Sequence, residues 1–277
     1  MLNKILTKKY NSLRFVEKNA IMEEGEINFI IYKDFEDKKL SIYYDENGFE
    51  ITFPDYCKYI YNHYTNTLYC YVKEEDDLLS TLYNLPYALL LKFRNRFLLH
   101  CSSLINDKGD LICFCGSKGV GKSTLVNLFS SRYNIISDDV LCVDQQMRPC
   151  IDNDFSLLKI EQIKCLPCGY IELVRKIKNT NKGIYINFEP EKGNGIIKKI
   201  YFINKERDKR LIIKKIAKSP LLKIKILSNL VGCDYGLHSL DDISDFSIGC
   251  IEVYELILPD SIEGLNRELK RLEDEII

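Results

Sequence analysis

A short stretch of the sequence combines the residue types that bind phosphate groups. Residues 114–124 read FCGSKGVGKST, which fits the pattern G-x-x-x-x-G-K-[ST] between an expected strand and an expected helix. In such a loop, backbone N–H groups surround phosphate oxygens at the positive end of the helix, and the lysine bridges the outer phosphates. The serine hydroxyl can ligate Mg²⁺. The sequence therefore predicts a nucleotide-binding loop at Gly116, Ser117, Lys118, Gly119, Val120, Gly121, Lys122, Ser123 and Thr124.

A pair of aspartates follows this loop after one expected helix and one expected strand. The apolar run YNIIS (133–137) delivers Asp138 and Asp139 at its end. Because the intervening helix has roughly ten residues, the chain runs out and returns along a neighbouring strand, which turns the carboxylates toward the phosphates. One carboxylate beside Mg²⁺ suffices for an ATPase, whereas two permit one to hold the metal and the other to take a proton from an attacking hydroxyl. A capping or turn role for the pair is the alternative.

The elements around the loop must position these groups. RFLLHCSSLI (96–105) and LICFC (111–115) are expected to be strands, and the second ends directly on Gly116. KSTLVNLFSS (122–131) is expected to leave the loop as a helix. His100 stands in the first of these strands, where a histidine is more often a core residue than a catalytic one, so the residues alone leave its role open.

The sequence on either side predicts an α/β fold with two domains. Residues 26–72 alternate β-rich segments with turns and predict a small antiparallel meander. Twelve of the eighteen tyrosines precede residue 96, on half-buried strands or on a partner-binding face. A broken helical connection follows, with caps at Asp76 and Asp77 and with Pro86 in a first turn. We expect a β-rich domain over 1–95 and a catalytic domain over 96–277.

Downstream, strands are expected in GIYINFEP (183–190), IIKKIYFIN (196–204) and GCIEVYELIL (249–258). The chain closes on an amphipathic helix over 261–276, with Ser261 or Asp260 as its cap. This mixture of strands and helices indicates an α/β protein.

Composition limits the classes of partner. With 39 basic and 40 acidic residues, the chain has no overall attraction to nucleic acid or to anionic membrane. No run approaches the roughly 18 apolar residues of a membrane span, so we expect a soluble, cytoplasmic protein. The eleven cysteines are expected to be mostly buried apolar residues, and CLPC (165–168) lacks the further ligands of a zinc site.

Charge is unevenly spread near the C-terminus. Residues 198–225 hold eleven basic and two acidic side chains, and residues 241–277 hold eleven acidic and three basic ones. Such blocks usually form solvated faces or complement each other across a fold. The more specific alternative is a basic surface that binds an acidic peptide or a phosphate.

Three segments together resemble a known family. LLHCSSLI (98–105), GDLICFCGSKGVGKSTLVNLF (109–129) and YNIISDDVLCVD (133–144) are similar to the catalytic domain of HPr kinase/phosphorylase and its shorter kinase-like relatives, which include peptide-modifying members. Residues 196–216 and 250–269 resemble later parts of that domain more loosely. The resemblance implies a P-loop kinase-like core of the HPr kinase type beside a small N-terminal β-rich domain. By the resemblance, Asp138 is the general base, Asp139 and Ser123 form the metal site, and His100 supports the aspartates.

The chain departs from HPr kinase itself at two places. Thr124 stands where that enzyme usually has an acidic residue, and no later glycine-rich signature for the protein substrate is found. The resemblance therefore does not extend to HPr as the acceptor or to the reverse phosphorylase reaction. INKERD (203–208) approaches the guanine-reading N-K-x-D motif but carries its aspartate one residue late, which disfavours a GTPase.

These observations predict an ATP- and Mg²⁺-dependent kinase with Lys122, Asp138, Asp139 and His100 in its catalytic site. The expected acceptor is a serine or threonine hydroxyl of a peptide or protein, and the N-terminal domain is the candidate for its recognition. A kinase for a small-molecule alcohol and a non-catalytic nucleotide-binding scaffold are the alternatives. The oligomeric state stays open, with a homo-oligomer allowed.

Overall fold

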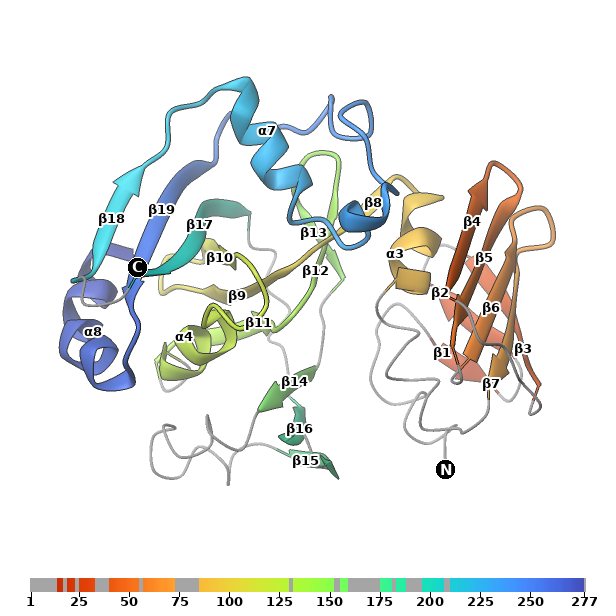
Figure 1. The fold of residues 1–277 in the computed structure, drawn as a ribbon, viewed down its shortest axis with the longest axis horizontal. Coiled ribbons are helices and arrows are strands. Elements are labelled where there is room, and N and C mark those ends of the chain that lie inside the picture. Colours follow the sequence, from red (N-terminus) through yellow and green to blue (C-terminus); the bar gives the residue numbers. More distant parts are fainter. Residues whose placement is uncertain are drawn as a thin grey trace. The chain divides into compact units, whose positions relative to one another are not determined.

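A computed structural model describes residues 14–16, 19–22, 25–32, 40–54, 57–72, 85–129, 132–151, 155–158, 175–180, 183–187, 196–206 and 210–276. By its internal contacts the chain divides into two compact units, Met1–Phe97 and Leu98–Ile277. Several sheets and a few helices make up the described residues (Figure 1), so the predicted α/β class is confirmed at that level.

The first unit holds a seven-stranded sheet in the order β1-β2-β3-β7-β6-β5-β4. The strands are β1 (Arg14–Val16), β2 (Asn19–Met22), β3 (Gly25–Tyr32), β4 (Ser41–Asp45), β5 (Gly48–Phe53), β6 (Cys57–Asn62) and β7 (Thr67–Val72). β4 to β7 pair antiparallel in sequence order, as the meander predicts. The all-antiparallel prediction is wrong at β3, which pairs parallel with β7 because β4 starts at the far edge of the sheet.

Buried and partly buried side chains alternate along β6, as a half-buried strand requires. In β6, Tyr59 and Tyr61 are buried, whereas Tyr43 and Tyr64 are 67% and 77% exposed. The tyrosines therefore divide between the core and the surface. The helix α3 (Leu85–Lys92) follows with Pro86 in its first turn, and the caps expected at Asp76 and Asp77 lie outside the described residues.

The second unit is built on a six-stranded sheet in the order β11-β9-β10-β17-β19-β18. Its strands are β9 (Cys101–Ile105), β10 (Leu111–Cys115), β11 (Asn134–Ser137), β17 (Ile197–Glu206), β18 (Ile212–Lys215) and β19 (Glu252–Pro259). β17 runs parallel to β10 and to β19, while β9 runs antiparallel to both β10 and β11. The carboxyl ends of β10, β11, β17 and β19 therefore share one edge of the sheet with the amino end of β9.

Two helices form the apolar layer on this sheet, α4 (Lys122–Phe129) and α8 (Ile262–Ile276). Leu125, Val126 and Phe129 of α4 lie in one buried cluster with Leu265 and Leu272 of α8 and with apolar side chains of β9, β10, β17 and β19. The Gly264 N–H donates to Ser261 Oγ at 3.0 Å, so the predicted cap at Ser261 is confirmed.

Two smaller sheets and two short helices are the remaining described elements, and one of their strands, β8, begins in the first unit. The order β13-β12-β8 joins β8 (Arg96–Leu99), β12 (Leu141–Asp144) and β13 (Pro149–Ile151), and the order β14-β16-β15 joins β14 (Phe155–Leu158), β15 (Arg175–Thr180) and β16 (Gly183–Asn187). The helix α7 (Pro220–Leu227) precedes a 3₁₀ turn, η1 (Cys233–Tyr235).

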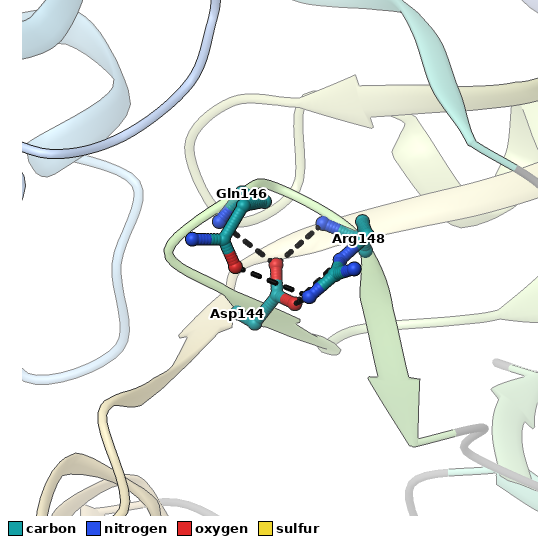
Figure 2. Close-up of polar contacts among 3 residues, drawn as sticks. All are labelled: Asp144, Gln146 and Arg148. Carbon is teal, nitrogen blue, oxygen red and sulfur yellow. Dashed lines mark hydrogen bonds and ion pairs between the residues drawn. The ribbon is translucent and has the colours of Figure 1, made fainter.

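The turn between β12 and β13 is closed by one carboxylate (Figure 2). Asp144 Oδ1 accepts the N–H groups of Gln146 and Arg148, both at 2.9 Å, and Arg148 Nε donates to Asp144 Oδ2 at 2.8 Å. Three donors on one carboxylate fix the hairpin that the chain enters directly after the aspartate pair.

The remaining sequence expectations concern the cysteines, the charged blocks and membrane-spanning helices. The described cysteines of the core, such as Cys57, Cys101 and Cys115, are buried free thiols, whereas CLPC (165–168) and residues 207–208 of INKERD lie outside the described residues. Lys215 of the basic block pairs with Glu252 of the acidic block. Within the described ranges, every helix is too short or too polar to cross a membrane.

The exit from β10 depends on a glycine. A Cβ at Gly116 would lie 2.9 Å from the carbonyl oxygen of Ile203, and the φ of Gly116 is +148°. We expect Gly116→Ala to lower the free energy of unfolding of the second unit by about 1–3 kcal/mol, the usual cost of a backbone held in a sparsely populated region. Chemical denaturation followed by circular dichroism measures it.

Gly249→Ala is the matched control, because nothing lies within 4 Å of a Cβ at Gly249 and its φ lies outside the left-handed region. Equal stabilities of the two variants would contradict the close approach of β10 and β17.

Candidate functional site

The loop after β10 is shaped by three glycines. Gly116, Gly119 and Gly121 have φ values of +148°, +85° and +109°. Side chains are unfavourable in such a backbone, and the loop ends where α4 begins at Lys122. Ser117, Lys118 and Gly119 are exposed, while Val120 is buried in the core beneath the loop. The nine residues predicted to bind nucleotide are thus one exposed loop and the first turn of a helix.

Lys122 is held inside this loop. Only 6% of the residue is exposed, and its ammonium group donates to the carbonyl oxygens of Gly116 and Ser117 at 2.7 and 3.2 Å. Burial lowers the pKa of Lys122, although the nearby carboxylates of Asp139 and Asp138 act in the opposite direction. The lysine and both aspartates therefore lie within electrostatic reach of one another.

Asp138 is buried at the end of β11. The residue is 5% exposed, and Ser102 Oγ donates to its Oδ1 at 2.6 Å. One step along the same strands, the hydroxyl oxygens of Ser103 and Ser137 lie 2.7 Å apart. Two serines of β9 thus fix the strand end that carries the aspartate pair.

Asp139, in contrast, points to solvent. Its side chain is 82% exposed, and His100 Nε2 lies 3.3 Å from its Oδ1. The hydrogen bond from His100 lowers the pKa of Asp139. Desolvation acts in the opposite direction, and the charges of Lys122 and Lys118 lower the pKa further. The φ of Asp139 is +83°, a left-handed conformation that aspartate and asparagine tolerate better than most residues.

The backbone of His100 is fixed from a different part of the chain. Its N–H donates to the carbonyl oxygen of Asn229 at 2.7 Å, and the Val231 N–H donates to the carbonyl oxygen of Leu98 at 2.9 Å. The segment after α7 therefore anchors the start of β9, where His100 contacts Asp139.

The sheet explains why these groups meet. In the antiparallel pairing of β9 with its neighbours, Cys101 lies opposite Cys115 and Ser103 lies opposite Ser137. The amino end of β9 is thereby placed between the carboxyl ends of β10 and β11. The four residues expected to be catalytic all lie near these strand ends. His100 directly precedes β9, Asp138 and Asp139 directly follow β11, and Lys122 stands at the end of the loop that follows β10.

A hollow of about 550 Å³ lies between the loop and the carboxyl end of β17. Its lining residues are Ser117, Lys118, Gly119, Val120, Asn204, Lys205 and Glu206. Lys205 reaches the loop backbone, since a Cβ at Gly121 would lie 3.5 Å from Lys205 Cε. Sequence reasoning assigned no site role to Lys205 or Ser102; the signals for them were the N-K of INKERD and the serines of HCSSLI.

The donors suit Mg²⁺ bound together with a nucleotide. Mg²⁺ is usually held by one or two carboxylates and by substrate phosphates rather than by a full protein cage. The exposed carboxylate of Asp139 and the hydroxyl of Ser123, in the first turn of α4, fit that pattern. In the described part of the chain, no three His, Cys, Asp or Glu side chains are grouped to hold a metal by themselves.

The known proteins that match this chain are solved structures, and one of them is a kinase. No family model matches the chain, and no curated protein matches it. The Hpr(Ser) kinase/phosphatase from Coxiella burnetii aligns with 64% of this chain and 98% of its own, at 13% identity and a TM-score of 0.28. At a TM-score this low the likeness carries no argument, and the case for the site rests on the residues of this chain.

The contact between His100 and Asp139 is testable by titration. We expect the pKa of Asp139 to lie below its ordinary value of 3.8 and to rise toward that value in His100→Ala, because the hydrogen bond that favours the carboxylate is lost. A depressed carboxyl pKa stabilises the folded state at pH values above 3.8. This stabilisation is lost as the pH falls through the lower pKa that Asp139 has in the folded state.

Carboxyl-carbon NMR of the wild type and of His100→Ala measures this shift. His63→Ala, which changes an exposed histidine of the first unit, is the control and should leave the titration of Asp139 unchanged. An identical Asp139 titration in His100→Ala would contradict the contact.

Proposed function

We propose that this chain is a kinase that uses ATP and Mg²⁺ to phosphorylate a hydroxyl, a serine or threonine of a peptide or protein. The observation that carries the proposal is the meeting, at one sheet edge, of a glycine loop with its lysine and an aspartate pair held by His100 and Ser102. A protein that only binds nucleotide has little use for a second carboxylate beside anionic phosphates.

The loop and α4 bind the triphosphate in this proposal. The backbone N–H groups of 116–121 and the amino end of α4 face the phosphates, and Lys122 contacts the outer phosphate oxygens. Mg²⁺, when bound by Ser123 and Asp139, neutralises charge on the β- and γ-phosphates. Because phosphoryl transfer is catalysed mainly by positioning and electrostatics, this arrangement supplies most of what the reaction needs.

The aspartate pair divides two tasks, and the structure makes the division testable. The family resemblance assigns the base to Asp138, which would orient the acceptor hydroxyl and take its proton. Accessibility favours exchanged roles, since Asp138 is 5% exposed whereas the Asp139 side chain is 82% exposed. A base must lie within hydrogen-bond reach of the hydroxyl, so the two assignments predict different kinetics for the two variants.

The first unit is the part we propose for acceptor recognition. It lies outside the sheet that carries the nucleotide loop, and it exposes the side chains of Tyr43 and Tyr64. Exposed tyrosines are enriched where proteins contact peptides and other proteins.

Replacing Lys122 tests nucleotide binding. We expect Lys122→Ala to weaken ATP affinity roughly 10- to 100-fold, the range for hydrogen bonds to a charged group. Lys198→Ala is the control, because Lys198 is an exposed lysine at the opposite end of β17. Isothermal titration with ATP and Mg²⁺ gives both affinities, and equal values for the two variants would overturn the loop as the phosphate site.

Neutralising each aspartate separates a kinase from a binder. Of Asp138→Asn and Asp139→Asn, the variant that removes the general base should transfer phosphate about 10²- to 10⁴-fold more slowly, while its ATP affinity changes little. The other variant should instead require more Mg²⁺ for half-maximal rate. Asparagine keeps the shape of both side chains and tolerates the left-handed backbone at 139.

Phosphate transfer from labelled ATP, measured over a range of Mg²⁺ concentrations, distinguishes the two assignments. Parent rates in both variants would mean that neither carboxylate is the base, whereas ATP binding without transfer in the wild type would make a nucleotide-binding scaffold the better account.

A further inference from the structure

The hollow and the aspartates lie on opposite sides of the loop. The sheet order places β11 and β9 on one side of β10 and β17 on the other. Asp138 and Asp139 follow β11, whereas Asn204, Lys205 and Glu206 form the carboxyl end of β17. Between them stands the loop that leaves β10. Phosphates bound in this loop therefore have the carboxylates to one side and the hollow to the other.

This arrangement gives the bound nucleotide a direction. If the terminal phosphate faces the aspartates, as phosphate transfer to an acceptor beside them requires, the other end of the nucleotide must leave the loop on the side of β17. We propose, building on the function above, that the hollow between Ser117–Val120 and Asn204–Glu206 receives the nucleoside part of the nucleoside triphosphate, with Lys205 as a further phosphate-binding residue at its mouth.

The dimensions of the hollow suit that ligand. Small-molecule sites commonly have volumes of about 300–1,000 Å³, and the hollow of about 550 Å³ lies within that range. Its walls combine the loop backbone with polar and charged side chains. The end of β17 is held in place because Asn204 Nδ2 donates to Glu255 Oε1, on β19, at 2.9 Å.

Lys205 contributes the charge. Its methylene chain lies against Gly121, and the Nζ atom lies 4.0 Å from a Cβ built there. Gly121 directly precedes α4, so the ammonium group of Lys205 lies beside the C-terminal end of the loop. In this position it faces the phosphate nearest the ribose, while Lys122 serves the outer phosphates.

Photolabelling with 8-azido-ATP tests the position of the base. In the wild-type protein with Mg²⁺, we expect the label, mapped by mass spectrometry, within Ser117–Val120 or Asn204–Glu206, and we expect excess ATP to prevent it. Label at His100 or in the segment after α7 would place the base beside the aspartates and overturn the inference, even in a protein that binds ATP through Lys122.

Lys205→Met tests the charge separately, because methionine keeps the unbranched chain and removes the ammonium group. Its ATP affinity should fall about two- to fivefold, as expected for an exposed ion pair, and the difference should shrink at high salt. Lys198→Met is the matched control and should bind ATP like the parent.

Failure of this inference and failure of the proposed function give different results. A wild-type protein that binds neither ATP nor 8-azido-ATP contradicts both. ATP binding that requires Lys122 but is unchanged in Lys205→Met leaves the phosphate loop standing and removes Lys205 from the site.

Discussion

β10 pairs antiparallel with β9 on one side and parallel with β17 on the other, and the position of each candidate group depends on that pairing. Cys115, the last residue of β10, lies opposite both Cys101 and Phe202. The chain has no room for a side chain at the next residue, because a Cβ at Gly116 would meet the carbonyl oxygen of Ile203. The loop must therefore leave the sheet at a glycine, beside His100 on one side and the end of β17 on the other.

Electrostatics adds a second constraint to this geometry. Lys122 is buried with its ammonium group on two carbonyl oxygens; burial lowers its pKa, whereas the carboxylates of Asp139 and Asp138 raise it. Asp139 carries the opposite charge in an exposed position, where His100 stabilises its carboxylate form. A triphosphate with Mg²⁺ would supply the anionic and cationic partners that these two groups can accept.

Local patterns in the sequence predicted the parts of the site that are close along the chain. The glycine spacing of 116–121, the strand before it and the helix after it follow from backbone preferences, and the structure has β10 and α4 at these positions. Ser261 as a helix cap was predictable for the same reason. Each of these features involves residues within a few positions of one another.

Contacts between distant segments were not predictable in this way. The hydrogen bond from Ser102 to Asp138 joins residues 36 positions apart, and that from His100 to Asn229 depends on where the chain returns after α7. The parallel pairing of β3 with β7 was missed because alternation identifies a strand but not its neighbour. Lys205 was overlooked for the same reason, since its contact with Gly121 exists only once β17 lies beside β10.

The central claim is that the loop and the aspartate pair form one phosphoryl-transfer site. The most direct test incubates the purified protein and Mg²⁺ with ATP labelled in the γ-phosphate and with a library of peptides that contain serine, threonine or neither. The account predicts label as an acid-stable ester on serine or threonine peptides, and none on peptides without a hydroxyl. Release of all label as free phosphate, or ATP binding without any turnover, would contradict it.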